Sequence, residues 1–238
     1  MGGFPVIAVR QFRYASDNLA YLIHGEKEAA AVDGGAVDEI LAFLKEQGLR
    51  LVFVLNTHSH YDHTSGNQEL LKRSGAAFLE NGDLRKKGFF TVDGEKITVY
   101  HTPGHTDDCL VFKTGDNLIT GDTLFTGTVG NCFSGNLQGF YQSIQMIRSF
   151  PPETIIYPGH DYVRESLIYA RTIEPGNPDI DRFLASYDPQ NVFSTLKEEM
   201  KINPYLRLND PKIIRMLEAE GLPVGTEYER WVSLMRAT

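Results

Sequence analysis

Short apolar runs alternate with amphipathic stretches along the first two thirds of the chain. The apolar runs end at Gly or Asn, a pattern typical of strands. They occupy residues 4–12, 18–25, 28–35, 49–57, 76–81, 96–102, 109–115, 117–125 and 154–160. Helical periodicity or propensity is found at residues 37–48, 62–73 and 137–150. This mixture predicts an α/β domain whose sheets are covered by helices on their outer faces.

From about Tyr162 the pattern changes and only helical stretches follow. Pro, Gly and Asn separate these stretches, as in "EPGNP", and mark where each helix should end. The stretches cover residues 162–174, 178–187, 194–202, 210–221 and 227–238. We therefore predict a first domain over residues 1–161 and a helical domain over residues 162–238.

Four of the apolar runs lead into a residue that can bind a metal ion. His58 follows the run at 49–57, and His105, Asp122 and His160 each stand immediately after a glycine. Glycine permits the sharp turns and the close backbone approach that converging strand ends need. Because function gathers at the carboxyl ends of strands in such sheets, we expect these four side chains to meet.

The run "THSHYDHTSG" at residues 57–66 holds the densest group of candidate ligands. His58 and His60 are two residues apart, so their imidazoles point the same way on an extended segment. Asp62 and His63 come after a bend, at the start of an expected helix, and can face a second ion. The run therefore predicts ligands for two neighbouring metal sites.

Only nitrogen and oxygen ligands are present in sufficient number. The two cysteines, Cys109 and Cys132, are too few for a thiolate site. We interpret the remaining histidines, His24 and His101, as hydrogen-bonded residues outside the site. Seven ligands are too many for one ion, whereas two divalent ions about 3.5 to 4 Å apart can share a carboxylate. These ligands suit zinc, iron or manganese, and we expect zinc or iron first.

A pair of ions held by such ligands has a defined chemical use. Coordination lowers the pKa of a water molecule to about 7 and so provides a nucleophile at neutral pH. The ions also polarise an oxygen of the group under attack. The sequence therefore predicts metal-assisted hydrolysis of a carbonyl or phosphoryl compound.

Charge and hydropathy exclude several kinds of partner. The 238 residues have a net charge of -8 and no dense cluster of Lys and Arg, so nucleic acid is not an expected partner. No apolar run approaches the roughly 18 residues of a membrane span, and the N-terminal residues lack the pattern of a secretory signal. We expect a cytoplasmic protein that acts on a small molecule. The oligomeric state leaves no mark in the sequence.

The motifs "THSHYDHTSG", "HTPGHT", "TGDTLF" and "YPGHDY" together resemble the metallo-β-lactamase superfamily. Further along, "YARTIEPGNP", "STLKEEM" and "NPYLR" resemble the helical domain of its glyoxalase II (hydroxyacylglutathione hydrolase) group. The resemblance spans nearly the whole chain and implies an αββα sandwich followed by a helical substrate-binding domain. It also implies hydrolysis of S-D-lactoylglutathione, or of a related thioester, to a hydroxy acid and glutathione or another thiol.

The same resemblance assigns roles to the candidate ligands. It implies that Asp122 bridges the two metal ions, and it makes Asp62 and Asp122 the catalytic carboxylates. The expected ligands of the first ion are His58, His60 and His105, and those of the second ion are Asp62, His63 and His160. Because every expected ligand lies at or before His160, removal of the helical domain should spare metal binding.

Two aromatic residues are expected to contact the substrate. Tyr162 matches an aromatic residue that contacts glutathione in the resembled group. The group often has Lys-Phe-Tyr after the "TGDTLF" loop, whereas this chain has Asn131, Cys132 and Phe133. Phe133 is thus the expected contact in that loop, and Cys132 is interpreted as a loop residue and not as a nucleophile.

The basic pair that the group places after its "NPF" motif is matched only in part. Arg207 is present, Asn209 and Asp210 follow it, and Lys212 stands one position further along than expected. By resemblance, Arg207 and Lys212 would pair with a carboxylate of the thiol. These departures leave the identity of the thiol open, while the prediction of thioester hydrolysis does not depend on them.

Three alternatives fit parts of the same sequence. A persulfide dioxygenase with one iron also resembles "HTPGHTDDC" and "YPGHDY", but such chains usually end soon after the last histidine and here 78 residues follow His160. A nuclease of the same superfamily is disfavoured by the acidic net charge. A protein with purely structural metals is disfavoured because structural zinc sites are usually closed and four-coordinate.

Overall fold

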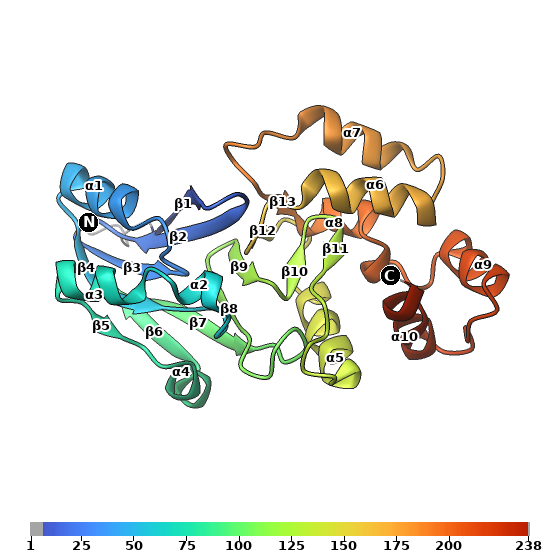
Figure 1. The fold of residues 1–238 in the computed structure, drawn as a ribbon, viewed down its shortest axis with the longest axis horizontal. Coiled ribbons are helices and arrows are strands. Elements are labelled where there is room, and N and C mark those ends of the chain that lie inside the picture. The colour runs from blue at the N-terminus through green and yellow to red at the C-terminus, as the bar shows by residue number, and fades with distance from the viewer. Residues whose placement is uncertain (1–6, 238) are drawn as a thin grey trace.

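The computed structural model of the chain describes residues 7–237 and shows two β-sheets packed face to face with helices outside them (Figure 1). The sandwich and the helical C-terminal region confirm the fold class predicted from the sequence. The first apolar run was expected to begin at Phe4, and its residues before Ile7 lie outside the described part of the chain. No helix in that part is long and apolar enough to cross a membrane.

The first sheet has the strand order β1-β2-β3-β4-β5. Strands β1, β2 and β3 pair antiparallel, whereas β3, β4 and β5 run parallel. The bounds are β1 Ala8–Tyr14, β2 Asn18–His24, β3 Glu28–Val32, β4 Arg50–Leu55 and β5 Ala77–Phe78. The parallel arrangement places the carboxyl ends of β3 and β4 at the same edge of the sheet.

The second sheet has the order β13-β12-β9-β8-β7-β6, in which β12 runs parallel to β9. Its bounds are β6 Phe89–Val92, β7 Glu95–His101, β8 Leu110–Thr114, β9 Asn117–Gly121, β12 Ile155–Pro158 and β13 Ser194–Thr195. A separate hairpin follows β9 and consists of β10 (Leu124–Phe125) and β11 (Thr128–Val129).

Alternation along the strands divides the core into layers. On β2, Leu19, Tyr21 and Ile23 pack between the two sheets, while Ala20 and Leu22 face outward. The outward face is covered by α1 (Val37–Gln47) and α3 (Asn67–Ser74). Helix α5 (Leu137–Arg148) covers the outer face of the second sheet. The buried faces of both sheets thus hold the strand ends in fixed positions.

The C-terminal region is helical, as predicted, and is joined to the sandwich. Its elements are α6 Val163–Ile173, α7 Pro178–Ser186, α8 Leu196–Ile202, the 3-10 helix η1 Pro204–Leu206, α9 Pro211–Ala219 and α10 Glu227–Ala237. Between α7 and α8, β13 pairs with β12 of the second sheet. Side chains of α6 and α7, such as Leu167 and Phe183, also reach the core between the sheets. The division after residue 161 stays a prediction.

Two local expectations were wrong. The helix predicted over residues 62–73 is split into α2 (Tyr61–Thr64) and α3. Between them, Gly66 approaches Gly34 so closely that a Cβ atom on Gly66 would lie 2.1 Å from the Gly34 carbonyl oxygen. The strand predicted over residues 76–81 is shorter than expected, and Asn81 begins a helix.

That helix, α4 (Asn81–Lys87), and the strand β6 after it were missed. Of the α4 residues only Leu84 is buried, so the segment has too few apolar positions to show a helical period.

Candidate metal centre

The seven predicted ligands lie in two adjoining groups at the ends of strands. His58 follows β4, His105 follows β7, Asp122 follows β9 and His160 follows β12. The two groups whose ligand atoms approach one another are His58, His60, His105 and Asp122, and Asp62, His63 and His160. The expected meeting of the four strand ends is therefore found.

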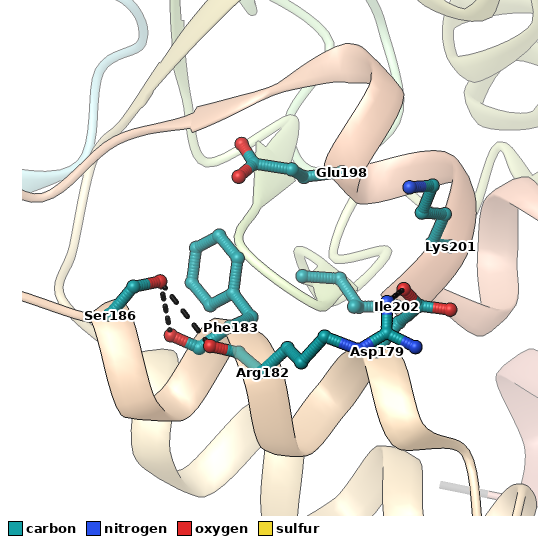
Figure 2. A pocket seen from close by; sticks show the side chains of 7 residues that line it. All are labelled: Asp179, Arg182, Phe183, Ser186, Glu198, Lys201 and Ile202. Carbon is teal, nitrogen blue, oxygen red and sulfur yellow. Dashed lines mark hydrogen bonds and ion pairs between the residues drawn. The ribbon is translucent and has the colours of Figure 1, made fainter.

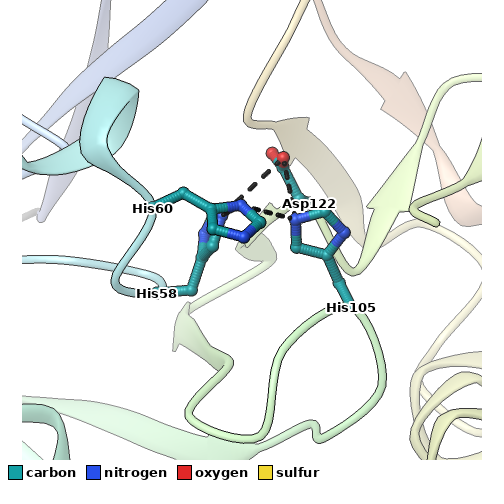
Figure 3. A group of neighbouring side chains, drawn as sticks. All are labelled: His58, His60, His105 and Asp122. Atoms are coloured by element: carbon teal, nitrogen blue, oxygen red, sulfur yellow. Dashed lines mark hydrogen bonds and ion pairs between the residues drawn. The ribbon is translucent and has the colours of Figure 1, made fainter. Parts of the chain in front are cut away.

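The first group has the spacing of a tetrahedral metal site (Figure 3). The Nδ1 atom of His60 lies 2.9 Å from Nε2 of His58 and 3.0 Å from Nε2 of His105. The Oδ2 atom of Asp122 lies 3.4 Å from His105 Nε2 and 3.8 Å from His58 Nε2. Four ligands at zinc bond lengths of about 2.1 Å would be separated by about 3.4 Å. One ion therefore fits among these atoms.

The second group is similarly close and shares Asp122. Nε2 of His63 and Nε2 of His160 are 3.1 Å apart, and Oδ2 of Asp62 lies 3.6 and 3.3 Å from them, respectively. Asp122 approaches His63 Nε2 through Oδ1 at 3.4 Å and His160 Nε2 through Oδ2 at 3.5 Å. Its carboxylate thus stands between the two groups, as a bridging ligand must.

One buried atom indicates that a cation belongs in this position. The side chain of Asp122 is buried, and its Oδ1 atom has no hydrogen-bond donor. A buried carboxylate oxygen without a partner is costly, and a metal ion would remove that cost. The histidine and carboxylate donors also match the ligand preference of divalent transition metals. The residues present therefore fit two metal ions.

Asp33 supports His63 through a direct hydrogen bond and His58 through Thr57. Its Oδ2 atom accepts a hydrogen bond from His63 Nδ1 at 2.9 Å and from the Thr57 hydroxyl at 2.7 Å, and its Oδ1 atom accepts from the Thr57 backbone N–H at 2.8 Å. The Thr57 oxygen lies 3.1 Å from His58 Nδ1 and can accept its proton. With Nδ1 so engaged, Nε2 is the nitrogen of each histidine that faces the site and is available to a metal ion.

Other supports come from different elements. His160 Nδ1 donates to Asp17 Oδ1 at 2.7 Å, and His105 Nδ1 donates to the Asn131 carbonyl at 2.9 Å. The Asn18 amide donates to Asp62 Oδ2 at 2.9 Å. Sequence analysis missed these supporting roles and that of Asp33.

Only Asp33 had a visible signal. It is an acidic residue at the end of an apolar run, next to two glycines, and so partly resembles the context of the other strand-end ligands, which follow a glycine.

The electrostatics of the centre favour a cation. Burial and the neighbouring His63 lower the pKa of His58 to about 4, so this imidazole is neutral at pH 7. Burial also disfavours a charge on His63, but Asp33 and Asp122 outweigh it and raise the pKa of His63 to about 11. Burial would raise the pKa of Asp122, yet its contacts with His160 and His63 hold that pKa well below its ordinary value. The negative carboxylates thus dominate the local field.

An aromatic side chain lies beside each group. The exposed ring of Phe133 has its centroid 5.2 Å from that of His105 and 5.7 Å from that of His60. Tyr162 stacks on His160 at the other group and also contacts Phe125, with ring centroids 5.2 Å apart. Both predicted aromatic contacts are therefore adjacent to the candidate metal centre.

Arg207 and Lys212, the two basic residues predicted to bind the thiol, have other interaction partners in the structure. The guanidinium of Arg207 pairs with the buried Glu174 and, at 2.5 Å, with Asp210. Lys212 is exposed, and its backbone N–H bonds to Asp210 Oδ1 at 2.9 Å. Within residues 7–237, no hydrogen bond or ion pair joins Arg207 or Lys212 to the candidate ligands. Their predicted role in binding the thiol stays a prediction.

A hollow of about 200 Å³ lies between α7 and α8, and Figure 2 shows the side chains that line it. Its lining residues are Asp179, Arg182, Phe183, Ser186, Glu198, Lys201 and Ile202. Arg182 is paired with Asp179 at 2.7 Å, and Glu198 caps its own helix by accepting from the backbone N–H of Thr195. Three of its four charged side chains, all except Lys201, are thus already engaged, and it contains none of the seven candidate ligands.

The chain matches two family models that meet at the last candidate ligand. Residues 14–83 and 80–160 match the metallo-beta-lactamase superfamily, and residues 161–235 match the hydroxyacylglutathione hydrolase C-terminus. A hydroxyacylglutathione hydrolase of Pseudoalteromonas translucida is 31% identical, with 95% of each chain covered. The cytoplasmic hydroxyacylglutathione hydrolase of Arabidopsis thaliana is 33% identical over 90% of this chain and 92% of its own.

A solved structure supports the same architecture. The crystal structure of ETHE1 from Myxococcus xanthus superposes with a TM-score of 0.68 at 25% identity. The alignment covers 96% of this chain and 90% of that chain. The likeness therefore includes the helical C-terminal region as well as the two sheets.

Proposed function

Since the chain belongs to the metallo-β-lactamase superfamily, and within it to the hydroxyacylglutathione hydrolase group, we propose that it hydrolyses S-D-lactoylglutathione or a closely related thioester. Family membership makes the chain a glyoxalase II-like metal-dependent hydrolase. The acyl group, the thiol and the metals are the proposed part. We propose zinc or iron as the two divalent ions. The cytoplasmic location stays a prediction.

One observation carries the proposal, namely the position of Asp122 between the two ligand groups. Its two carboxylate oxygens reach ligand atoms of both groups at 3.4 to 3.8 Å. When bound there, two divalent ions would activate a water molecule and polarise the thioester carbonyl. We assign His58, His60 and His105 to one ion, Asp62, His63 and His160 to the other, and Asp122 to both.

The protein's own groups orient these ligands. The acceptors behind His63, His160 and His105 hydrogen-bond to Nδ1 of each ring, so Nε2 is the nitrogen that would bind a metal ion. Asn18 fixes Oδ2 of Asp62, and the hydrogen bond from Asn18 contributes to a lowered pKa of this partly exposed carboxylate. Asp62 therefore remains ionised and can orient a water molecule at the open side of the centre.

The substrate is proposed to lie across the two aromatic side chains. Phe133 borders the first ligand group and Tyr162 the second, so a thioester between them would have its carbonyl near Asp122. Burial and nearby Asp17 raise the pKa of Tyr162 to about 12, so its hydroxyl keeps its proton at pH 7 and can donate a hydrogen bond. Lys212 and Arg207 are the proposed contacts of a thiol carboxylate.

The test combines metal analysis of the purified protein with a substrate panel. We expect two ions per chain and hydrolysis of lactoylglutathione without oxygen uptake. A panel of short neutral thioesters and glutathione persulfide completes the comparison. A single iron per chain, together with oxygen uptake on glutathione persulfide and no thioesterase activity, would favour the dioxygenase and contradict the proposal.

A further inference from the structure

The hairpin β10–β11 links the two halves of the candidate metal centre. Asp122 stands just before β10, and the Asn131 carbonyl, which accepts the His105 Nδ1 proton, stands just after β11. Phe125 of β10 also contacts the His160 ring, with centroids 6.0 Å apart. A shift of this hairpin would therefore disturb ligands of both groups.

Two buried polar side chains from the C-terminal helices hold the hairpin turn. Oε2 of Glu199 in α8 accepts hydrogen bonds from the Gly127 backbone N–H and from the Asn203 amide, both at 3.0 Å. The same amide lies 3.0 Å from the Thr128 carbonyl oxygen and 3.4 Å from that of Phe125. Glu199 and Asn203 are both fully buried. Together they engage the backbone on both sides of the turn.

The turn has little freedom to move away from these contacts. Gly127 has a φ of +79°, and a Cβ atom there would lie 2.6 Å from the Leu167 side chain of α6. The turn is thus enclosed between α6 and α8, and Figure 1 shows the hairpin beside both helices. Its position is set by the helical region as much as by the second sheet.

A packing role alone does not account for a carboxylate at this position. Glu199 has no Lys or Arg partner in the described part of the chain, and its Oε1 atom has no hydrogen-bond donor. A buried carboxyl group with an unsatisfied oxygen destabilises a protein, and apolar side chains of similar size fill space at lower cost. What Glu199 does provide is an acceptor for the Gly127 N–H and an anchor for Asn203.

We propose that Glu199 and Asn203 are positioning residues of the metal centre, which fix the hairpin so that Asp122 bridges the two ions and the Asn131 carbonyl orients His105. The inference rests on the proposed function only in assuming that the seven ligands bind metal. It also changes one expectation from the sequence. The helical region would support metal binding as well as hold substrate, so its loss would not spare the metal centre.

The test compares metal affinity in full-length variants, measured by competition with a chelator. Glu199→Ala removes the acceptor and should weaken binding of zinc by about tenfold or more, as expected for groups that orient metal ligands. Glu199→Gln keeps an acceptor for Gly127 and should recover most of the affinity. Asn203→Ser, which loses the contacts with both hairpin carbonyls, should resemble Glu199→Ala.

Glu174→Gln is the matched control. Glu174 is equally buried in the helical region, but it pairs with Arg207, and no hydrogen bond or ion pair among the described residues joins it to the hairpin. This variant should lose thermal stability and keep the wild-type affinity for zinc. If Glu174→Gln weakened zinc binding as much as Glu199→Ala, the effect would be a general loosening and the proposal would fail.

Wild-type affinity in Glu199→Ala and Asn203→Ser would also overturn it. Should Glu199→Ala not fold, wild-type affinity in Asn203→Ser alone would be enough to reject the proposal. Because no substrate is used, a wrong thioester assignment would not change any of these outcomes, whereas wild-type protein that binds no zinc would contradict the metal centre itself.

Discussion

Tyr162 stacks face to face on His160, with ring centroids 4.8 Å apart and only 6° between the ring planes. A candidate substrate contact and a candidate metal ligand therefore touch directly. Tyr162 is also the residue that precedes α6, so the ring is placed by the first helix of the C-terminal region. The proposed substrate contact would thus be coupled to the geometry of the second ligand group through this pair.

Replacement of Tyr162 by Ala should raise KM for lactoylglutathione roughly two- to tenfold, because burial of about 20–60 Å² of the ring against the substrate contributes about 0.5–1.5 kcal/mol. Tyr162→Phe keeps the ring, and its KM should be close to that of the wild type unless the hydroxyl donates a hydrogen bond to the substrate. Steady-state kinetics of the three proteins separate the two contributions. An unchanged KM in Tyr162→Ala would place the substrate elsewhere.

Asp122→Ala should lower metal occupancy at both positions, since one carboxylate reaches both ligand groups. Metal analysis after dialysis against a weak chelator would measure it. Asp107→Ala is the control, because Asp107 is an exposed carboxylate two residues from His105 and outside both groups. Loss of one ion with full retention of the other would show that Asp122 serves a single site.

Asp33→Ala should weaken metal binding by about ten- to a hundredfold, although Asp33 belongs to neither ligand group. It would leave the His63 Nδ1 proton and the Thr57 backbone N–H without acceptors in a buried place. The free energy of unfolding should also fall by about 1–3 kcal/mol for each donor left unsatisfied. Chelator competition and urea unfolding would measure the two effects, and wild-type affinity would show that His63 needs no such support.

The stability of the protein should depend on pH through Glu199. Burial raises the pKa of this carboxyl from 4.5 to about 7, so between those values the folded protein holds a proton that the unfolded chain has released. The folded state therefore loses stability as pH rises from about 4.5 to 7. Urea unfolding with chelator present should show a gentler decline for Glu199→Gln than for wild type. Parallel profiles would mean that Glu199 titrates normally.

Substitution of Lys212 and substitution of Arg207 should have different effects, the first on KM and the second on stability. Lys212→Ala is expected to raise KM for a glutathione thioester, an effect that added salt should reduce, and to leave KM for a short neutral thioester unchanged. Arg207→Ala would strand Glu174 as a buried charge and should cost about 3–5 kcal/mol of stability. Equal KM changes on both substrates would show that Lys212 is an ordinary surface charge.

The sequence was sufficient to predict which candidate ligands lie together wherever the signal was local. His105, Asp122 and His160 each follow an apolar run and a glycine, so the strand end and the ligand can be recognised within a few residues. The supporting groups are different in kind. Asp17 reaches His160 across 143 positions of the chain, and Glu199 reaches Gly127 across 72. Such pairs arise only from tertiary packing, and no short sequence motif predicts them.

The same limit explains the errors in the fold. Helical periodicity alone continues through the break between α2 and α3, where Gly66 lies close to Gly34 of a different segment. The sequence also does not show that Glu174 and Asp210 lie beside Arg207. Local pattern predicted the elements, and packing decided where they end and which charges are already paired.

The position of Glu199 and Asn203 in the sequence has a consequence for the order in which the protein folds and binds metal. On the ribosome all seven candidate ligands emerge before α8, so a nascent chain that ends after His160 has every donor atom but not the side chains that fix the hairpin. Ions captured at that stage would be held loosely and exchanged easily. Stable binding of the metal ions would then occur late, after the chain has been synthesised. The metal ions available in the cell at that time would decide which ions the site keeps.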